Sequence, residues 1–232
     1  MNFFAKHFYK LVVLLVLLFV VLAANAGPKL PNDAPVYLPM LVEEIDTHWK
    51  DMEYREFTAG LVEQESFWKL RAELKHAREY GCGFGQFTKT YNKDGSIRFD
   101  ALTETKALHK SLANWNWEDC SNARFQLRGM LLKLKANERS CKVWMDDPLD
   151  IKRCDGSSYN GGLGGYSARI RMCRAKADCN PRKWVGHLEL QCAASNVKQA
   201  GYGESFCQIN SKYPGRVIQR MEKYKPYMIR QP

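Results

Sequence analysis

Two glutamates, Glu63 and Glu65, are the side chains of this sequence best suited to acid–base chemistry. On a helix, Phe57, Leu61 and Glu65 recur at four-residue spacing and share one apolar face, whereas Glu63 points to the opposite side. Burial disfavours the charged form of a carboxyl group and raises its pKa, so such a group can act as a general acid near neutral pH. On periodicity alone, a carboxylate that bends from the helix end into solvent is the more common case.

Two glycine-rich segments are suited to lining a site around such an acid. Residues 81–88 place three glycines around Gln86 and two phenylalanines, and residues 158–162 place Tyr159 and Asn160 before two glycines. Glycine lets the backbone approach a ligand closely, and a glutamine side chain can hydrogen-bond a sugar. Each segment alone is also typical of an ordinary turn.

Taken in chain order, these motifs resemble the lytic transglycosylases of the goose-type-lysozyme-like family. Members of that family carry a Glu-Ser pair at a helix end, a Gly-Leu-Met-Gln-type motif, an Ala-Tyr-Asn motif and a late Tyr followed by Arg-Val. The corresponding residues here are Glu65-Ser66, Gly83-Phe84-Gly85-Gln86, Tyr159-Asn160, and Tyr213 with Arg216-Val217. The resemblance covers about residues 40–228, and the sequence around Tyr159 is similar to that of phage and prophage cell-wall lysins.

The resemblance implies a mainly α-helical, lysozyme-like domain with Glu65 as its single catalytic acid/base. Glu65 would protonate the β-1,4 bond between N-acetylmuramic acid and N-acetylglucosamine in peptidoglycan. The 6-hydroxyl of the muramic residue would then close an anhydro ring, and neither a cofactor nor a metal ion takes part. The residues implied to line the substrate cleft are Ser66, Gln86, Tyr159, Asn160 and Tyr213. The Tyr159 hydroxyl would lie beside Glu65, and Tyr213 would close the far side of the cleft.

Three features depart from the family pattern. Gly85 stands where the family usually has Met, which changes the packing beneath the cleft. Residues 150–157 are polar where relatives have an apolar helix, and this puts the placement of Tyr159 in question. The eight cysteines are also more than most members carry.

Two alternative functions remain open. A hydrolytic lysozyme on the same fold that inverts the sugar needs a second carboxylate roughly 6.5–9.5 Å from the first. Asp94 and Asp100 are the candidates, although both also fit ordinary solvated loop acids. The other alternative is a non-catalytic envelope-binding protein that kept the fold and would bind peptidoglycan without turnover.

The spacing of apolar residues indicates the elements that position these groups. Leu41, Ile45, Trp49 and Met52 begin a helical pattern that continues to about residue 66. Further helices are predicted over residues 101–117, 124–135 and 217–227, and a loop or hairpin over 80–96 with a small β element near 84–100. Pro148, several glycines and many polar residues predict a long irregular connection over 146–165.

The first 26 residues have the pattern of an export signal. Lys6 and Lys10 precede an apolar run over residues 11–24, which is shorter than the roughly 20 residues of a spanning helix. Small residues follow at Ala24-Asn25-Ala26, where signal peptidase would cut. A cleaved signal is the leading interpretation, and a retained anchor is the alternative. Residues 27–37, with Pro31 and Pro35, are predicted to be an extended lead-in to a single catalytic domain over 38–232.

Charge and export together restrict the partner. The chain carries a formal net charge of +10, which suits an acidic polymer of the cell envelope, in the periplasm or the extracellular cell-wall space. Nucleic acid is disfavoured because export separates the protein from it and because the basic residues are scattered. The predicted partner is therefore the glycan strands of peptidoglycan, bound by a monomer without stable membrane insertion once the signal is removed.

All eight cysteines lie after the predicted signal. An even number of cysteines in an oxidising compartment indicates disulfides, and Cys173–Cys179 is the pair predicted first because it closes a small local loop. The competing zinc set would be Cys173, Cys179, His187 and Cys192, but its spacing matches no common zinc module.

Overall fold

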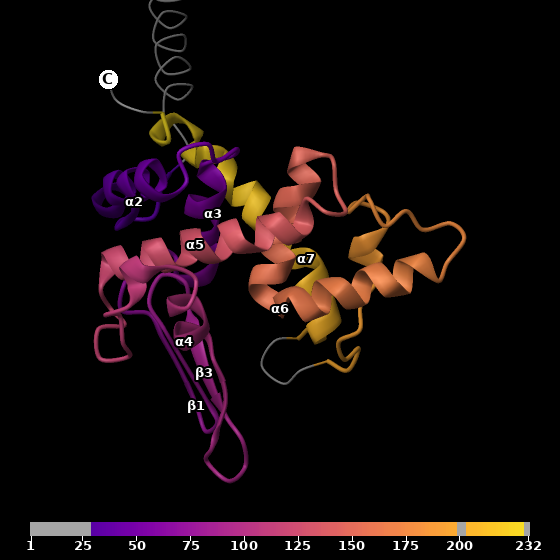
Figure 1. Ribbon diagram of the computed structural model, residues 1–232, viewed down its shortest axis with the longest axis horizontal. Coiled ribbons are helices and arrows are strands. Elements are labelled where there is room, and N and C mark those ends of the chain that lie inside the picture. Colours follow the sequence, from indigo (N-terminus) through magenta and orange to yellow (C-terminus); the bar gives the residue numbers. More distant parts are fainter. Residues whose placement is uncertain (1–28, 199–202, 230–232) are drawn as a thin grey trace, which may run out of the picture. The chain divides into compact units, whose positions relative to one another are not determined.

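The computed structural model describes residues 29–198 and 203–229 (Figure 1). The chain divides at Leu30 into two units, and the fold below belongs to the second, which starts at Pro31. The predicted signal, residues 1–26, lies outside the described residues. Among the helices that are described, none combines the length and the apolar character needed to cross a membrane.

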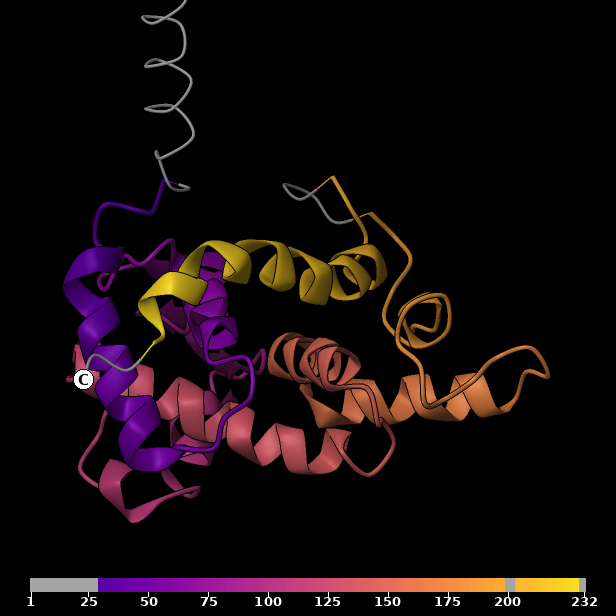
Figure 2. The ribbon, with the colours of Figure 1, turned by 90° about the horizontal axis from the view of Figure 1, so that it is seen from above.

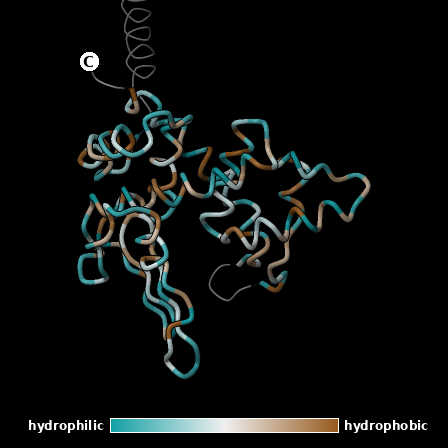
Figure 3. The backbone as a smooth tube through the Cα atoms, viewed as in Figure 1, coloured by the Kyte–Doolittle hydropathy of each residue, from teal (hydrophilic) through white to brown (hydrophobic). Residues whose placement is uncertain are grey.

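Helices make up most of the fold, and a small antiparallel sheet accompanies them, as predicted. The α-helices are α2 (Ala34–His48), α3 (Glu56–Ser66), α4 (Ala101–Lys106), α5 (Ala123–Cys141), α6 (Pro148–Arg174) and α7 (Phe206–Met221). The 3-10 helices are η1 (Lys110–Leu112), η2 (Leu188–Leu190) and η3 (Glu222–Tyr227). Figure 3 shows hydrophilic and hydrophobic residues interleaved along the chain, as expected for elements that each bury only one face.

Helix α3 lies at the centre of the packing, and all its residues are buried except Gln64 and Glu65, which are half-buried. Helix α7 packs against both α3 and α6 (Figure 2). Gly60 makes the first of these contacts close, because a Cβ there would come within 2.8 Å of the Val217 carbonyl oxygen and the Met221 nitrogen. The helix that carries the candidate acid is therefore held tightly from behind by the C-terminal helix.

The sheet forms an arm that extends away from the helices (Figure 1). Its strands are β1 (Glu73–His76), β2 (Glu79–Cys82), β3 (Phe87–Tyr91) and β4 (Ile97–Asp100), paired antiparallel in chain order. The predicted element near 84–100 thus covers only the second half of the sheet. Strand β1 is mostly exposed, so it lacks the apolar alternation by which a half-buried strand is identified.

The prediction of an irregular connection over 146–165 is wrong, because helix α6 runs through it. Asp147 caps the helix by accepting a hydrogen bond from the Asp150 backbone nitrogen at 2.8 Å, and Pro148 occupies the first turn, where proline is tolerated. Residues 150–157 are polar because several of them form buried ion pairs, not because they face solvent. The Lys152 amine is buried against the carboxylates of Glu138 and Asp155.

The glycines of α6 have two separate roles. A Cβ at Gly156 would lie 3.3 Å from the Pro214 Cα, so the absent side chain lets α6 and α7 approach each other. Gly162 has φ +73° and ψ 159° and marks a kink at which the helix changes direction. A helix made in this way shows neither the apolar stripe nor the composition that usually predicts one.

Smaller differences concern where helices start and stop. Helix α2 begins at Ala34, inside the segment predicted to be extended. The helix predicted over 101–117 ends at Lys106 and is followed by η1, and Trp115 and Trp117 lie outside any helix. Helix α5 continues to Cys141, beyond the predicted 124–135, and the helix predicted over 217–227 is α7, which begins at Phe206, followed by η3.

All eight cysteines lie in the described residues and all are paired. The disulfides are Cys82–Cys120, Cys141–Cys154, Cys173–Cys179 and Cys192–Cys207. The predicted Cys173–Cys179 pair is confirmed. Three of the four residues in the alternative zinc set are in disulfides, so they lack the free thiolates that a zinc site requires. Four disulfides are compatible with an oxidising compartment.

Candidate active site

A cleft of about 1220 Å³ lies among the sheet and helices α3 to α7. Five of the residues implied by the resemblance line it: Glu65, Gln86, Tyr159, Asn160 and Tyr213. Segments that are far apart in the sequence therefore meet at one place. Ser66 is the exception, because its hydroxyl is buried and donates to the Val62 carbonyl at 3.1 Å within α3.

Glu65 faces this cleft from the last turn of α3. The Tyr213 hydroxyl donates a hydrogen bond to its Oε1. Burial raises the pKa of the Glu65 carboxyl to about 7, while the Tyr213 hydrogen bond and the positive charge of Lys133 oppose that rise. Protonated and ionised forms are then comparably populated at neutral pH, so the group can both give and take a proton.

Glu63 occupies the opposite side of α3, as the helical spacing predicts. It accepts hydrogen bonds from the Tyr224 hydroxyl and, at 2.7 Å, from the Lys223 amine. The Trp68 indole in turn donates to the Tyr224 hydroxyl at 2.8 Å. These contacts fix η3 against α3 and leave Glu63 outside the cleft.

The loop over residues 83–86 contributes Gly85 and Gln86 to the lining of the cleft, and Gln126 holds it in place. The Gly85 nitrogen donates to the Gln126 Oε1 at 3.1 Å, and the Gln126 Nε2 donates to the Cys120 carbonyl at 2.7 Å. Gln126 is fully buried on α5. Nothing in its local sequence pattern distinguishes it, so sequence analysis missed it.

Gly85 is explained by the tyrosine packed against it. The Tyr159 hydroxyl donates to the Gly85 carbonyl at 2.8 Å, and a Cβ at residue 85 would meet that hydroxyl at 2.6 Å and the Met130 Cγ at 2.7 Å. The methionine usual in the family would collide at this position. A glycine at this position therefore leaves the space in the wall of the cleft that the Tyr159 hydroxyl occupies.

Tyr159 lies near Glu65, as the resemblance implied, but Tyr213 rather than Tyr159 is the tyrosine that hydrogen-bonds the acid. Tyr159 lies close enough for the Glu65 charge to add to burial in raising the pKa of its hydroxyl, but it bonds to Gly85. Tyr213, expected on the far side, is the direct hydrogen-bond partner of Glu65. Both tyrosines are buried in the wall of the cleft.

Gln86 and Asn160 line the cleft but are bound to the protein. The Gln86 Nε2 donates to the carbonyls of Ala72 at 3.2 Å and Gly83 at 3.0 Å, so its amide protons maintain the loop. The Asn160 side chain donates to the Asn210 side chain and links α6 to α7 at the exposed edge of the cleft. Their placement agrees with the expectation, whereas a contact to sugar is not needed to explain either residue.

Lys133 on α5 is a cleft residue that sequence analysis missed. Its amine lies 4.5 Å from the centroid of the Tyr159 ring, in a cation–π arrangement. Burial lowers the pKa of Lys133, while Glu65 and Glu104 oppose that change. The available signal was a lysine inside the apolar run Leu131-Leu132-Lys133-Leu134, which a solvated lysine would not be expected to interrupt.

Neither acid proposed as a second carboxylate lines the cleft. Asp94 accepts hydrogen bonds from Ser96 in the turn between β3 and β4. Asp100 caps α4 through the Thr103 nitrogen at 2.9 Å and accepts from the Trp117 indole at 3.0 Å. The carboxylates that line the cleft with Glu65 are Glu79, Glu104 and Glu204.

Searches against protein-family models, curated proteins and solved structures find no match to this chain. The cleft itself therefore carries the functional argument. Within residues 29–198 and 203–229, no three histidine, cysteine or acidic side chains are grouped so that they could hold a metal ion.

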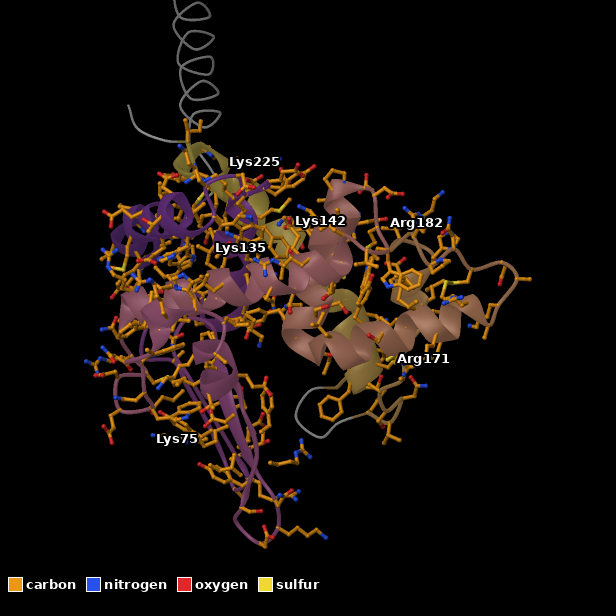
Figure 4. All side chains as sticks on the ribbon, viewed as in Figure 1. Lys75, Lys135, Lys142, Arg171, Arg182 and Lys225 are labelled. Carbon is orange, nitrogen blue, oxygen red and sulfur yellow. A yellow bond between two sulfur atoms is a disulfide. The ribbon has the colours of Figure 1, made fainter. Side chains whose placement is uncertain are left out.

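The basic residues do not gather at the cleft. The lysines and arginines labelled in Figure 4 lie on β1, α5, α6, η3 and the loops beside them: Lys75, Lys135, Lys142, Arg171, Arg182 and Lys225. Only Lys133 and Arg216 carry positive charge in the cleft lining that the structure describes. The positive charge of the chain is thus spread over the fold, and the cleft is locally acidic.

Proposed function

We propose that this protein is an exported, lysozyme-like enzyme that cleaves the glycan strands of peptidoglycan with Glu65 as its proton donor. The observation that carries the proposal is the Glu65 carboxyl group in a large cleft, with a pKa of about 7 and a tyrosine hydroxyl bonded to it. Glycosidic bonds are broken by protonation of the leaving oxygen, and this requires a carboxyl group that is still protonated near neutral pH.

The size and lining of the cleft support a polymeric sugar substrate. Its volume of about 1220 Å³ exceeds the roughly 300–1,000 Å³ of a typical small-molecule pocket. The lining alternates apolar side chains such as Phe87 and Leu163 with amides and hydroxyls such as Gln64 and Thr88. A sugar ring presents both kinds of surface, because its faces carry C–H groups and its edges carry hydroxyls.

The reaction is that of a lytic transglycosylase acting between N-acetylmuramic acid and N-acetylglucosamine. Glu65 donates its proton to the bridging oxygen, the bond to the muramic C1 breaks, and the N-acetylglucosamine leaves with a new hydroxyl. The ionised Glu65 then accepts the proton of the muramic 6-hydroxyl as that oxygen attacks C1 and closes the anhydro ring. Tyr213 stabilises the ionised form of Glu65 between the two steps through its hydrogen bond.

A hydrolytic lysozyme is the second candidate, and Glu104 is the observation in its favour. Glu104 lines the same cleft and lies near enough to Lys133 for its charge to oppose the lowering of that amine's pKa by burial. In an inverting hydrolase a second carboxylate activates water on the face of the sugar opposite the acid. A third possibility, envelope binding without catalysis, makes a different prediction, namely affinity for peptidoglycan with no cleaved product.

Digestion of purified peptidoglycan followed by mass spectrometry tests the proposal. The parent protein is expected to release fragments with anhydro ends, and Glu65→Gln is expected to release almost none. Glu104→Gln separates the two enzymatic mechanisms, because it should leave a transglycosylase active and disable a hydrolase that depends on that acid. Release of reducing ends that disappears in Glu104→Gln would replace the first mechanism by the second. Unchanged release by Glu65→Gln would refute both.

A further inference from the structure

Three buried polar atoms in residues that line the cleft have no hydrogen-bond partner in the part of the chain that the structure describes. They are the Gln64 Oε1, the Thr90 Oγ1 and the Asn137 Nδ2. A buried polar atom without a partner destabilises a protein, and a ligand that supplies the partner removes that penalty. Asn137 lines the cleft and is only 6% exposed, and its buried Nδ2 has no hydrogen-bond partner in the described residues.

Asn137 and Lys133 are four residues apart on α5 and therefore lie on one face of the helix. Both line the cleft. In the described residues, no carboxylate lies within ion-pair distance of the Lys133 amine. Arg216, the other cation of the lining, is already paired with Glu204 at 3.1 Å. The wall of the cleft thus presents an amine that contacts the Tyr159 ring and has no ion-pair partner, next to an amide donor without a hydrogen-bond partner.

We propose that Lys133 and Asn137 bind a carboxylate group of the substrate beside the bond that Glu65 cleaves. Both side chains offer N–H donors, and a carboxylate accepts only, so the chemistry is complementary. The cleft otherwise contains the acids Glu65, Glu79, Glu104 and Glu204, which repel an anionic ligand. The ammonium group of Lys133 offsets that repulsion at one position.

This subsite rests on the proposed function and names the part of the substrate that it recognises. Carboxylates occur in two places on peptidoglycan: on the lactyl group of muramic residues that have lost their peptide, and on the stem peptide itself. Chitin oligomers have a similar sugar backbone and carry no carboxylate. Lys133 and Asn137 would therefore make the enzyme prefer the bacterial polymer to chitin.

Isothermal titration of the Glu65→Gln protein measures the subsite without cleavage of the ligand. The ligands are a chitin tetrasaccharide, a peptide-free tetrasaccharide with alternating muramic residues, and the same tetrasaccharide with stem peptides. Adding Lys133→Met should weaken binding of a carboxylate-bearing ligand at least about tenfold, because a hydrogen bond to a charged group is lost. Binding of the chitin oligomer should be nearly unchanged, and Asn137→Ala should show the same selectivity with a smaller loss.

Arg139→Met is the matched control, because it removes one positive charge from an exposed position of the same helix. It should affect all three ligands equally and slightly. Thermal melting of each variant verifies that it is folded, and Lys133→Arg should restore part of the selectivity.

The pattern over the three ligands decides the outcome. A loss confined to the peptide-free ligand supports the proposal and identifies the lactyl carboxylate, whereas a loss confined to the peptide-bearing ligand supports it and identifies the peptide. An equal loss with chitin, or no loss at all, overturns the subsite. If the Glu65→Gln protein binds none of the three glycans, the proposed function fails as well.

Discussion

Helix α3 carries a glutamate on each of two opposite sides, and the two glutamates have different surroundings. Glu63 and Glu65 are two residues apart, yet Glu63 is surrounded by Lys223, Arg220 and the Tyr224 hydroxyl, whereas Glu65 has one tyrosine hydroxyl and an open cleft. Burial raises the pKa of the Glu65 carboxyl to about 7, and the Tyr213 hydrogen bond and the positive charge of Lys133 only partly oppose that rise. The surroundings supplied by distant elements therefore decide which glutamate holds the fold and which one can exchange protons.

The largest expected difference between the two glutamates is in the catalytic activity of their glutamine variants. Glu65→Gln should lower kcat/KM about 10²–10⁴-fold, because glutamine cannot donate the proton to the leaving oxygen. Glu63→Gln should keep most of the activity of the molecules that remain folded. Initial rates on soluble glycan strands, normalised to folded protein, provide the measurement. Equal losses in the two variants would show that the assignment of the acid is wrong.

The effect on stability should be the reverse of the effect on activity: Glu63→Gln should destabilise the folded protein more than Glu65→Gln does. Glu63→Gln removes the charge that binds Lys223 and disturbs the Tyr224 hydroxyl, at a cost of about 1–3 kcal/mol. In a chain of this size the melting temperature should fall by several degrees. Calorimetric scans of the parent and both variants at one pH make the comparison. A Glu63→Gln protein that melts with the parent would mean that η3 is held by other contacts.

The tyrosines of the cleft provide a finer test of the Glu65 side. Tyr213→Phe should lower kcat/KM about tenfold and raise the pKa of Glu65 further, because it removes the hydrogen bond that opposes the effect of burial. Tyr159→Phe should cost less, since its hydroxyl bonds to the Gly85 carbonyl. A larger loss for Tyr159→Phe than for Tyr213→Phe would restore the assignment that the resemblance implied.

The smallest expected effect is a pH-dependent gain in stability in Glu65→Gln. The folded pKa of Glu65 is raised to about 7 from an ordinary 4.5, so the folded state binds more protons than the unfolded state between those values. Stability therefore falls as pH rises through that window, and glutamine avoids the loss. The variant should melt a few degrees above the parent above pH 7 and with it below pH 4.5. A melting temperature of Glu65→Gln that exceeds the parent's only at acidic pH would contradict the raised pKa of Glu65.

Local patterns predicted the parts of this molecule whose partners are close in sequence. The apolar spacing in α3 placed Glu63 and Glu65 on opposite sides, and the short spacing of Cys173 and Cys179 identified a disulfide. The polar segment that became α6 was misassigned, because the carboxylate that satisfies Lys152 comes from Glu138 on another helix. A local pattern contains no information about such a partner.

Partners that are distant in sequence also explain why only part of the candidate site was predicted. Glu65 could be singled out from its own helix, but its hydrogen-bond partner is 148 positions away along the chain. The resemblance implied that the Tyr159 hydroxyl would lie beside the acid, whereas that hydroxyl donates to the Gly85 carbonyl at 2.8 Å, where the absence of a side chain on residue 85 leaves room for it. Lys133 was detectable as a lysine within a run of leucines, whereas Gln126 and Asn137 were not.

The pH dependence of kcat/KM on soluble peptidoglycan strands tests the central claim most directly, because it reports the ionisation of the free enzyme's essential acid. The account predicts cleavage that declines as pH rises, with an apparent pKa of about 7, and no such decline in the residual activity of Glu65→Gln. Cleavage that is constant or increases through neutral pH, or a decline that persists in Glu65→Gln, would contradict the assignment of Glu65 as the proton donor.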